Sequence, residues 1–123
     1  MAGEVSGAIG LVLRSGPYQQ RAARSQLDVA LVAAALDQPL RLYFLGYSVL
    51  QLIGAREPGA AGLPPGYRGW ASLPGLTRIT AFADTGWFDW LLENGTGSVL
   101  ALEPATRQQM QADWRACHRV LVL

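Results

Sequence analysis

The chain has 123 residues, which is the size of one domain, and half of them are hydrophobic, enough for one real core. The formal net charge is only +1 and the arginines are scattered, so composition gives no support for direct binding to nucleic acid. No apolar run approaches the roughly 20 residues that span a bilayer, and no signal peptide is visible, so we expect a cytoplasmic protein without a membrane partner.

The charged fraction is 15%, well below the roughly 25% of typical soluble domains. A small protein must cover a large surface with polar groups, so this deficit predicts that other subunits cover part of the surface. We therefore expect an oligomer, formed either with itself or with another chain.

The first predicted elements are a buried strand and a long helix. Residues 8–13 form a nearly continuous apolar run that ends in a turn at 14–17. Residues 19–36 show the i, i+3, i+4 spacing of a helix, and Val32 and Leu36 extend its apolar character to a second face. A helix that is apolar on two faces is expected to pack against more than its own sheet.

Proline and glycine mark the limits of the next elements. Pro39 ends the long helix and a second strand covers residues 40–45. Residues 47–53 form a short helix. Residues 54–66, with four glycines and three prolines, are predicted to be a mobile loop.

The rest of the chain alternates between helices and strands. We predict a weak helix at 67–73, a strand at 78–83, a helix at 85–93, a strand at 98–102, a helix opened by Glu103-Pro104 that runs to about Ala116, and a strand at 119–123. This alternation predicts a parallel five-stranded sheet with helices on both faces, in a single domain over residues 1–123.

In open α/β sheets, ligands gather beyond the carboxyl ends of the strands. At this edge we expect candidate binding residues in two turns, after the first and second strands: Ser15, Gly16, Tyr18 and Tyr47. The first turn lacks the glycine spacing of a dinucleotide fingerprint and the lysine of a P-loop. It is interpreted as a plain turn or as a contact for a small anion or a partner.

The third strand is followed by Asp84, which also belongs to this edge. Asp84 can cap the following helix, or it can serve as a general acid or base, although no second carboxylate is paired with it. In that helix Trp87, Phe88 and Trp90 lie on more than one face, which fits either core packing or the centre of a protein interface.

Cys117 is the single cysteine, so no disulfide can form within the chain, and a reducing compartment is expected. Its neighbour His118 is adjacent in sequence, but neighbouring side chains at a helix-to-strand junction usually diverge. One cysteine and one histidine are too few for a zinc site, and we expect no metal and no cofactor. Cys117 is predicted to lie at the amino end of the last strand, away from the candidate site.

Several motifs, in order and spacing, resemble the DsrE/DsrF-like family of sulfur-relay proteins, most closely its TusC/DsrF type. They are Leu-Asp-Val-Ala-Leu at 27–31, the aromatic strand that runs into "G-Y-S-V-L-Q-L" at 46–52, the Ser-Gly-Pro-Tyr turn at 15–18, and the final strand at 119–123. The resemblance implies a three-layer α/β/α fold with a five-stranded parallel sheet. It also implies assembly with paralogous DsrE- or DsrH-like subunits, or with further copies of the chain.

Sulfur carriers of this family hold a persulfide on a cysteine at the end of strand three, in tRNA 2-thiouridine synthesis or sulfur oxidation. The corresponding residues here are Ala-Phe-Ala-Asp at 81–84, without a cysteine. The resemblance therefore implies a non-catalytic subunit or scaffold of such a complex, with no catalytic residue of its own. Two alternatives stay open: a small-ligand or anion-binding module at the carboxyl edge, and a sulfur acceptor that uses Cys117.

Overall fold

The computed structural model describes residues 7–14, 20–53, 67–95 and 97–123. The predicted loop at 54–66, and the candidate residues Ser15, Gly16 and Tyr18, lie outside these ranges. Within the described part of the chain, no helix is long and apolar enough to cross a membrane.

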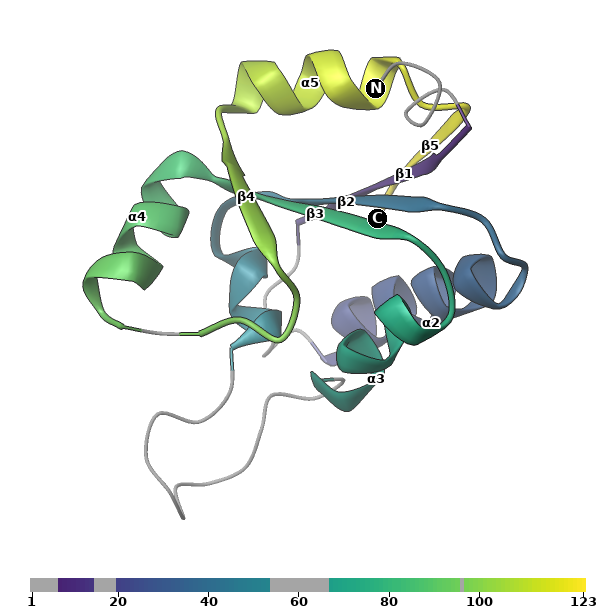
Figure 1. The fold of residues 1–123 in the computed structure, drawn as a ribbon, viewed down its shortest axis with the longest axis horizontal. Helices are drawn as coiled ribbons and strands as arrows, with labels where there is room; N and C mark the ends of the chain where they lie inside the picture. Colours follow the sequence, from purple (N-terminus) through teal and green to yellow (C-terminus); the bar gives the residue numbers. More distant parts are fainter. Residues whose placement is uncertain (1–6, 15–19, 54–66, 96) are drawn as a thin grey trace.

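The described chain forms a five-stranded parallel sheet with helices on both faces, as predicted, in the order β4-β3-β2-β1-β5 (Figure 1). The strands are β1 (Ile9–Leu13), β2 (Leu40–Phe44), β3 (Ile79–Asp84), β4 (Leu102–Ala105) and β5 (Arg119–Val122). The α-helices are α2 (Gln20–Ala35), α3 (Tyr67–Ser72), α4 (Thr85–Glu93) and α5 (Arg107–Arg115), and the 3₁₀ segments are η1 (Gly46–Leu52) and η2 (Leu73–Gly75).

The topology explains how the helices divide between the two faces. The chain moves stepwise from β1 through β2 and β3 to β4, and then returns across the sheet to place β5 beside β1. Right-handed crossovers put the outgoing helices on one face and the returning helix on the other. Figure 1 shows this arrangement, with α5 on one side of the sheet and α2 and α3 on the opposite side.

The larger core lies between the sheet and helices α2, α3 and α4. One buried cluster joins strand residues such as Leu42 and Phe44 to Leu27 of α2, Trp70 of α3 and Leu91 of α4. Trp70 is fully buried and meets the Phe44 ring edge-on, with a centroid distance of 5.4 Å. Leu27 and Ala30 follow the helical spacing from which α2 was predicted.

The smaller core lies under α5. There Val12, Tyr43, Phe82 and Ala105 of the sheet pack against Met110 of α5. These strand residues alternate with those of the larger core, as a strand with both faces buried requires.

Buried polar contacts fix the short 3₁₀ segment η1 at the carboxyl end of the sheet. The Ser48 hydroxyl donates to the Leu13 carbonyl at 3.0 Å, which joins η1 to β1. The Gln51 amide donates to Oε1 of Gln26 at 3.2 Å, which joins η1 to α2. All three side chains are buried, so these bonds replace contacts that water would otherwise supply.

Two predictions near the C-terminus are wrong. The fourth strand is not 98–102 but Leu102–Ala105, and Glu103 and Pro104 lie within it rather than opening a helix. Pro104 is tolerated because β4 is an edge strand, where one missing N–H need not break the ladder. The true start of α5 is marked by Thr106, whose hydroxyl accepts from the Gln109 N–H while the Gln109 side chain accepts from the Thr106 N–H.

This capping box gives a test of the revised boundary. Thr106→Ala removes the hydroxyl that satisfies the Gln109 N–H and should lower the free energy of unfolding by about 1 kcal/mol. Urea denaturation would measure the change. Gln108→Ala, an exposed neighbour on the same helix, should change stability by less than about 0.5 kcal/mol. Equal effects of the two variants would contradict the assignment of Thr106 as the cap.

Candidate functional site

Asp84 ends β3 at the carboxyl edge of the sheet, as predicted. It occupies the N-cap position of α4, but its side chain makes no capping hydrogen bond. Its Oδ2 atom instead accepts the backbone N–H of Gly46 at 2.5 Å and lies 3.3 Å from Nη2 of Arg107. The carboxylate therefore ties β3 to the start of η1 and to the start of α5.

A cavity of about 510 Å³ opens beside this carboxylate. It is lined by Leu50 of η1 and by Asp84, Gly86, Trp87 and Trp90 at the β3–α4 junction. The two indole rings lie 5.8 Å apart at 69°, an edge-to-face arrangement. The structure thus brings Asp84, Trp87 and Trp90 into one pocket, although the sequence had suggested them separately as binding and interface residues.

The other described candidates, Phe88 and Tyr47, are not among the residues that line this pocket. Phe88 is half-buried, and Tyr47 is 44% exposed on η1. Trp90 is 38% exposed and its neighbour Leu92 is 66% exposed. Trp90 and Leu92 therefore expose apolar groups on the two flanks of α4, on either side of the buried Leu91.

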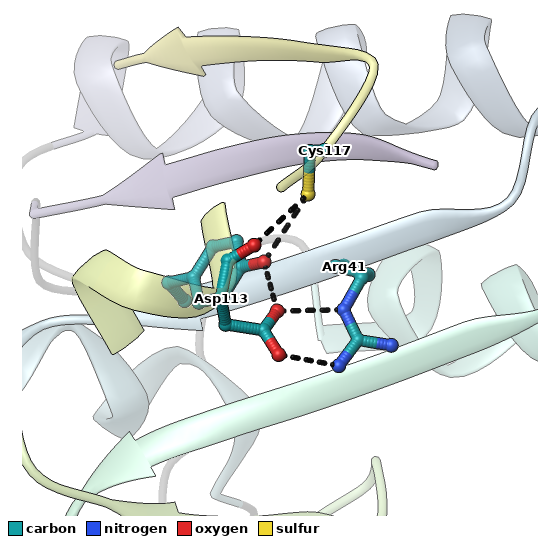
Figure 2. A network of polar contacts seen from close by, with 4 residues as sticks. Arg41, Asp113 and Cys117 are labelled. Carbon is teal, nitrogen blue, oxygen red and sulfur yellow. Dashed lines mark hydrogen bonds and ion pairs between the residues drawn. The ribbon is translucent and has the colours of Figure 1, made fainter. Parts of the chain in front are cut away.

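A second polar cluster lies between the sheet and α5 (Figure 2). Arg41 of β2 makes a bidentate ion pair with Asp113 of α5, with Nε–Oδ1 at 2.7 Å and Nη2–Oδ2 at 2.8 Å. The Tyr43 hydroxyl donates to Oδ1 of Asp113 at 2.5 Å. Arg41 also stacks over the Phe82 ring, with its guanidinium carbon 5.2 Å from the centroid.

The electrostatics of this cluster favour an ionised Asp113. Burial opposes ionisation, but the hydrogen bonds from Arg41 and Tyr43 and the guanidinium charge outweigh it, so the pKa of Asp113 lies below its usual value. Burial, with the hydrogen bond to Asp113, raises the pKa of the Tyr43 phenol. Tyr43 is therefore neutral, and its hydroxyl donates a hydrogen bond to the carboxylate.

Cys117 completes this cluster at the amino end of the sheet, where it was expected. Its Sγ lies 3.3 Å from the Tyr43 oxygen and 3.8 Å from the Asp113 carbonyl oxygen. Because the phenolic proton points to Asp113, the single S–H of Cys117 has two acceptors within reach, the Tyr43 oxygen and the Asp113 carbonyl. Burial and the nearby Asp113 charge raise the pKa of Cys117, so the uncharged thiol is favoured.

The space around Cys117 is also closed by the sheet. A Cβ at Gly10 of β1 would lie 3.2 Å from Sγ and 3.2 Å from the Tyr43 ring, so a side chain there would crowd both groups. Among the described residues, no group of three or more histidine, cysteine or acidic side chains could hold a metal ion.

The spacing of polar residues along the second strand is a sequence signal for this cluster. Arg41 and Tyr43 are two residues apart on a strand, so they share a face, while Leu40, Leu42 and Phe44 occupy the other. Asp113, near the end of α5, lies opposite them only because α5 returns across β3 and β2. The partner could not be identified without the strand order.

The ion pair gives a test with a defined pH dependence. Asp113→Asn leaves the partly buried Arg41 without its countercharge and should lower the free energy of unfolding at pH 7 by about 1–3 kcal/mol. Since folding lowers the pKa of Asp113, its contribution is present above pH 4 and is lost as the pH falls through the folded-state pKa. Urea denaturation from pH 7 to pH 2 should show the difference from the parent chain shrinking below about pH 4.

Asp89→Asn, at an exposed position of α4, is the matched control and should change stability by less than about 0.5 kcal/mol at any of these pH values. A difference between Asp113→Asn and the parent chain that persists unchanged to pH 2 would contradict the ion pair.

No family model matches the chain. It is 36% identical over 50 residues to a protein of Aliivibrio fischeri named Protein TusC homolog, a match that covers 41% of this chain and 42% of that protein. The chain thus matches less than half of the length of this relative.

The fold has a solved counterpart over almost its whole length. The crystal structure of the YchN protein from Escherichia coli superposes with a TM-score of 0.69 and covers 94% of this chain and 98% of that one, at 14% sequence identity. The partial sequence match and the fold therefore support the resemblance to the DsrE/TusC-like family that the motifs suggested.

Proposed function

We propose that this chain is a non-catalytic subunit of a cytoplasmic sulfur-relay complex, bound to paralogous DsrE- or DsrH-like subunits that carry the sulfur. Such a complex serves tRNA 2-thiouridine synthesis or sulfur oxidation. The observation that carries the proposal is the side chain at the end of β3, where the sulfur carriers of the resembled family hold a cysteine.

Asp84 stands at that position, and its carboxylate cannot take over the chemistry. Transfer of a persulfide sulfur requires an acceptor thiolate that forms a new S–S bond while the donor leaves as a thiolate. A carboxylate forms no such bond, and Oδ2 of Asp84 is already engaged by Gly46 and Arg107. This supports a structural role for the edge of the sheet in this chain.

Cys117 does not supply the missing thiol. It lies at the opposite end of the sheet, beside the start of β1, and burial with the nearby Asp113 charge raises its pKa, which favours the unreactive thiol form. The alternative in which Cys117 accepts sulfur therefore has no support from its surroundings.

Exposed apolar side chains support assembly with a partner. Leu92 of α4 is 66% exposed and Trp90 of the same helix 38%, and Val32 and Leu36 of α2 are 62% and 68% exposed. Large exposed apolar groups in a chain with few charges are typical of surfaces that a partner covers. We place the main contact on α4, because there the exposed groups include a tryptophan, a residue enriched at the centres of interfaces.

Co-expression with a cysteine-bearing DsrE-like paralogue from the same genome tests the assembly. The two chains should co-purify and elute together in size-exclusion chromatography with light scattering. Leu92→Asp should weaken the complex by about tenfold or more, because it places a charge in an apolar contact. Leu76→Asp, at a leucine 47% exposed outside α4, is the matched control and should assemble normally. A chain that stays monomeric with every such paralogue would contradict the proposal.

Cys117 should remain unmodified while the paralogue's cysteine gains sulfur. After incubation with a cysteine desulfurase and cysteine, mass spectrometry should show no one-sulfur gain on this chain. Iodoacetamide should alkylate native Cys117 at pH 8 at least about tenfold more slowly than the same residue in urea, because burial and the raised pKa are lost on unfolding. A one-sulfur gain on native Cys117 would overturn its assignment as a structural thiol.

A further inference from the structure

We propose that the pocket at the carboxyl end of β3 binds a small organic cation, an alkylated ammonium group, against the adjoining rings of Trp87 and Trp90 and beside Asp84. This inference goes beyond the proposed assembly, and every residue that it uses belongs to this chain. It is tested on the chain alone, because a partner on α4 and a ligand in the pocket would share Trp90. It also changes the expectation of an anion at this edge, since an anion would face the Asp84 carboxylate.

The pocket has the size and lining of a small-molecule site. Its volume of about 510 Å³ falls within the range of typical ligand pockets, roughly 300–1,000 Å³. Leu50 and the two indoles supply an apolar lining, and Asp84 supplies one charged group. Gly86 adds no side chain, and a Cβ there would meet nothing within 4 Å, so this wall borders open space. A ligand with an apolar surface and one charged centre matches this composition.

The two tryptophans form an aromatic corner. Their rings lie 5.8 Å apart at 69°, and both line the pocket. Indole is the aromatic side chain that attracts cations most strongly, and cages of such rings are the usual means of recognising quaternary ammonium groups. Trp90 is 38% exposed, so a ligand can reach it from solvent.

The charges around the corner favour a cation. Asp84 retains 20% of its side-chain exposure, and its Oδ1 atom accepts no hydrogen bond from the described residues. The side chains of α4 add Asp89 and Glu93 and no basic group. The N-terminus of α4 contributes only about half a positive charge against the full charge of Asp84. Arg107 approaches Oδ2 at 3.3 Å but is 52% exposed, so solvent screens much of its charge.

Choline and its uncharged isostere, 3,3-dimethyl-1-butanol, form a matched pair of probes because they have the same shape and differ in one charge. Titration followed by indole N–H signals in NMR should show choline binding about tenfold more tightly than the alcohol. Shifts should be confined to the indoles of Trp87 and Trp90, leaving Trp70 and Trp114 unchanged. Equal affinities, or no binding of choline at millimolar concentration, would overturn the proposal.

Variants separate the ring contribution from the charge. Asp84→Asn keeps an acceptor for the Gly46 N–H and should weaken choline binding about fivefold or more while leaving the alcohol unaffected. Trp90→Leu should weaken choline binding by a similar factor, about fivefold. Asp89→Asn and Phe88→Leu, on the same helix but outside the pocket lining, should bind choline as the parent chain does. Thermal melting checks that each variant is folded, and a folded Asp84→Asn that binds choline unchanged would exclude this site.

Discussion

The ion pair between Arg41 and Asp113 is the interaction on which one whole face of the sheet depends. Among the described helices, α5 alone covers that face, and it must cross from one edge of the sheet to the other to place β5 beside β1. Its apolar contact rests mainly on Met110 and Trp114. The bidentate geometry, backed by the Tyr43 hydroxyl, fixes both the rotation of α5 and its position along β2. Cys117 and β5 follow α5 directly in the chain, so the position of this helix sets where they lie.

The parts of the fold that could be predicted are those with a local cause. Helix α4 has the bounds that were predicted, 85–93, and the spacing of Leu27 and Ala30 identified α2. The boundary of β4 was missed because Pro104 suits both a helix start and an edge strand, and only the strand order distinguishes them. The threonine and glutamine of the capping box were the better local signal.

The candidate site also has one feature that the sequence predicts and one that depends on tertiary packing. That Asp84 lies at the carboxyl edge follows from the alternation of strands and helices, since parallel strands end on one side. That its carboxylate holds Gly46 instead of capping α4 depends on a contact 38 residues away along the chain. Gly46 can meet it because its φ of 55° turns the backbone sharply at the end of β2, a conformation that favours glycine. Such pairings arise from tertiary packing and leave no periodic trace.

The proline in β4 has a consequence for how the sheet can grow. An edge strand offers unpaired N–H and C=O groups to any other strand, and proteins often block such edges. Pro104 has no N–H to offer at the β4 edge. Strand β5 contains no proline, and its last two residues, Leu121 and Val122, are 39% and 59% exposed. The two edges are therefore unequal. Strand addition, whether by a neighbouring subunit or in unwanted aggregation, meets less resistance beside β5 than beside β4.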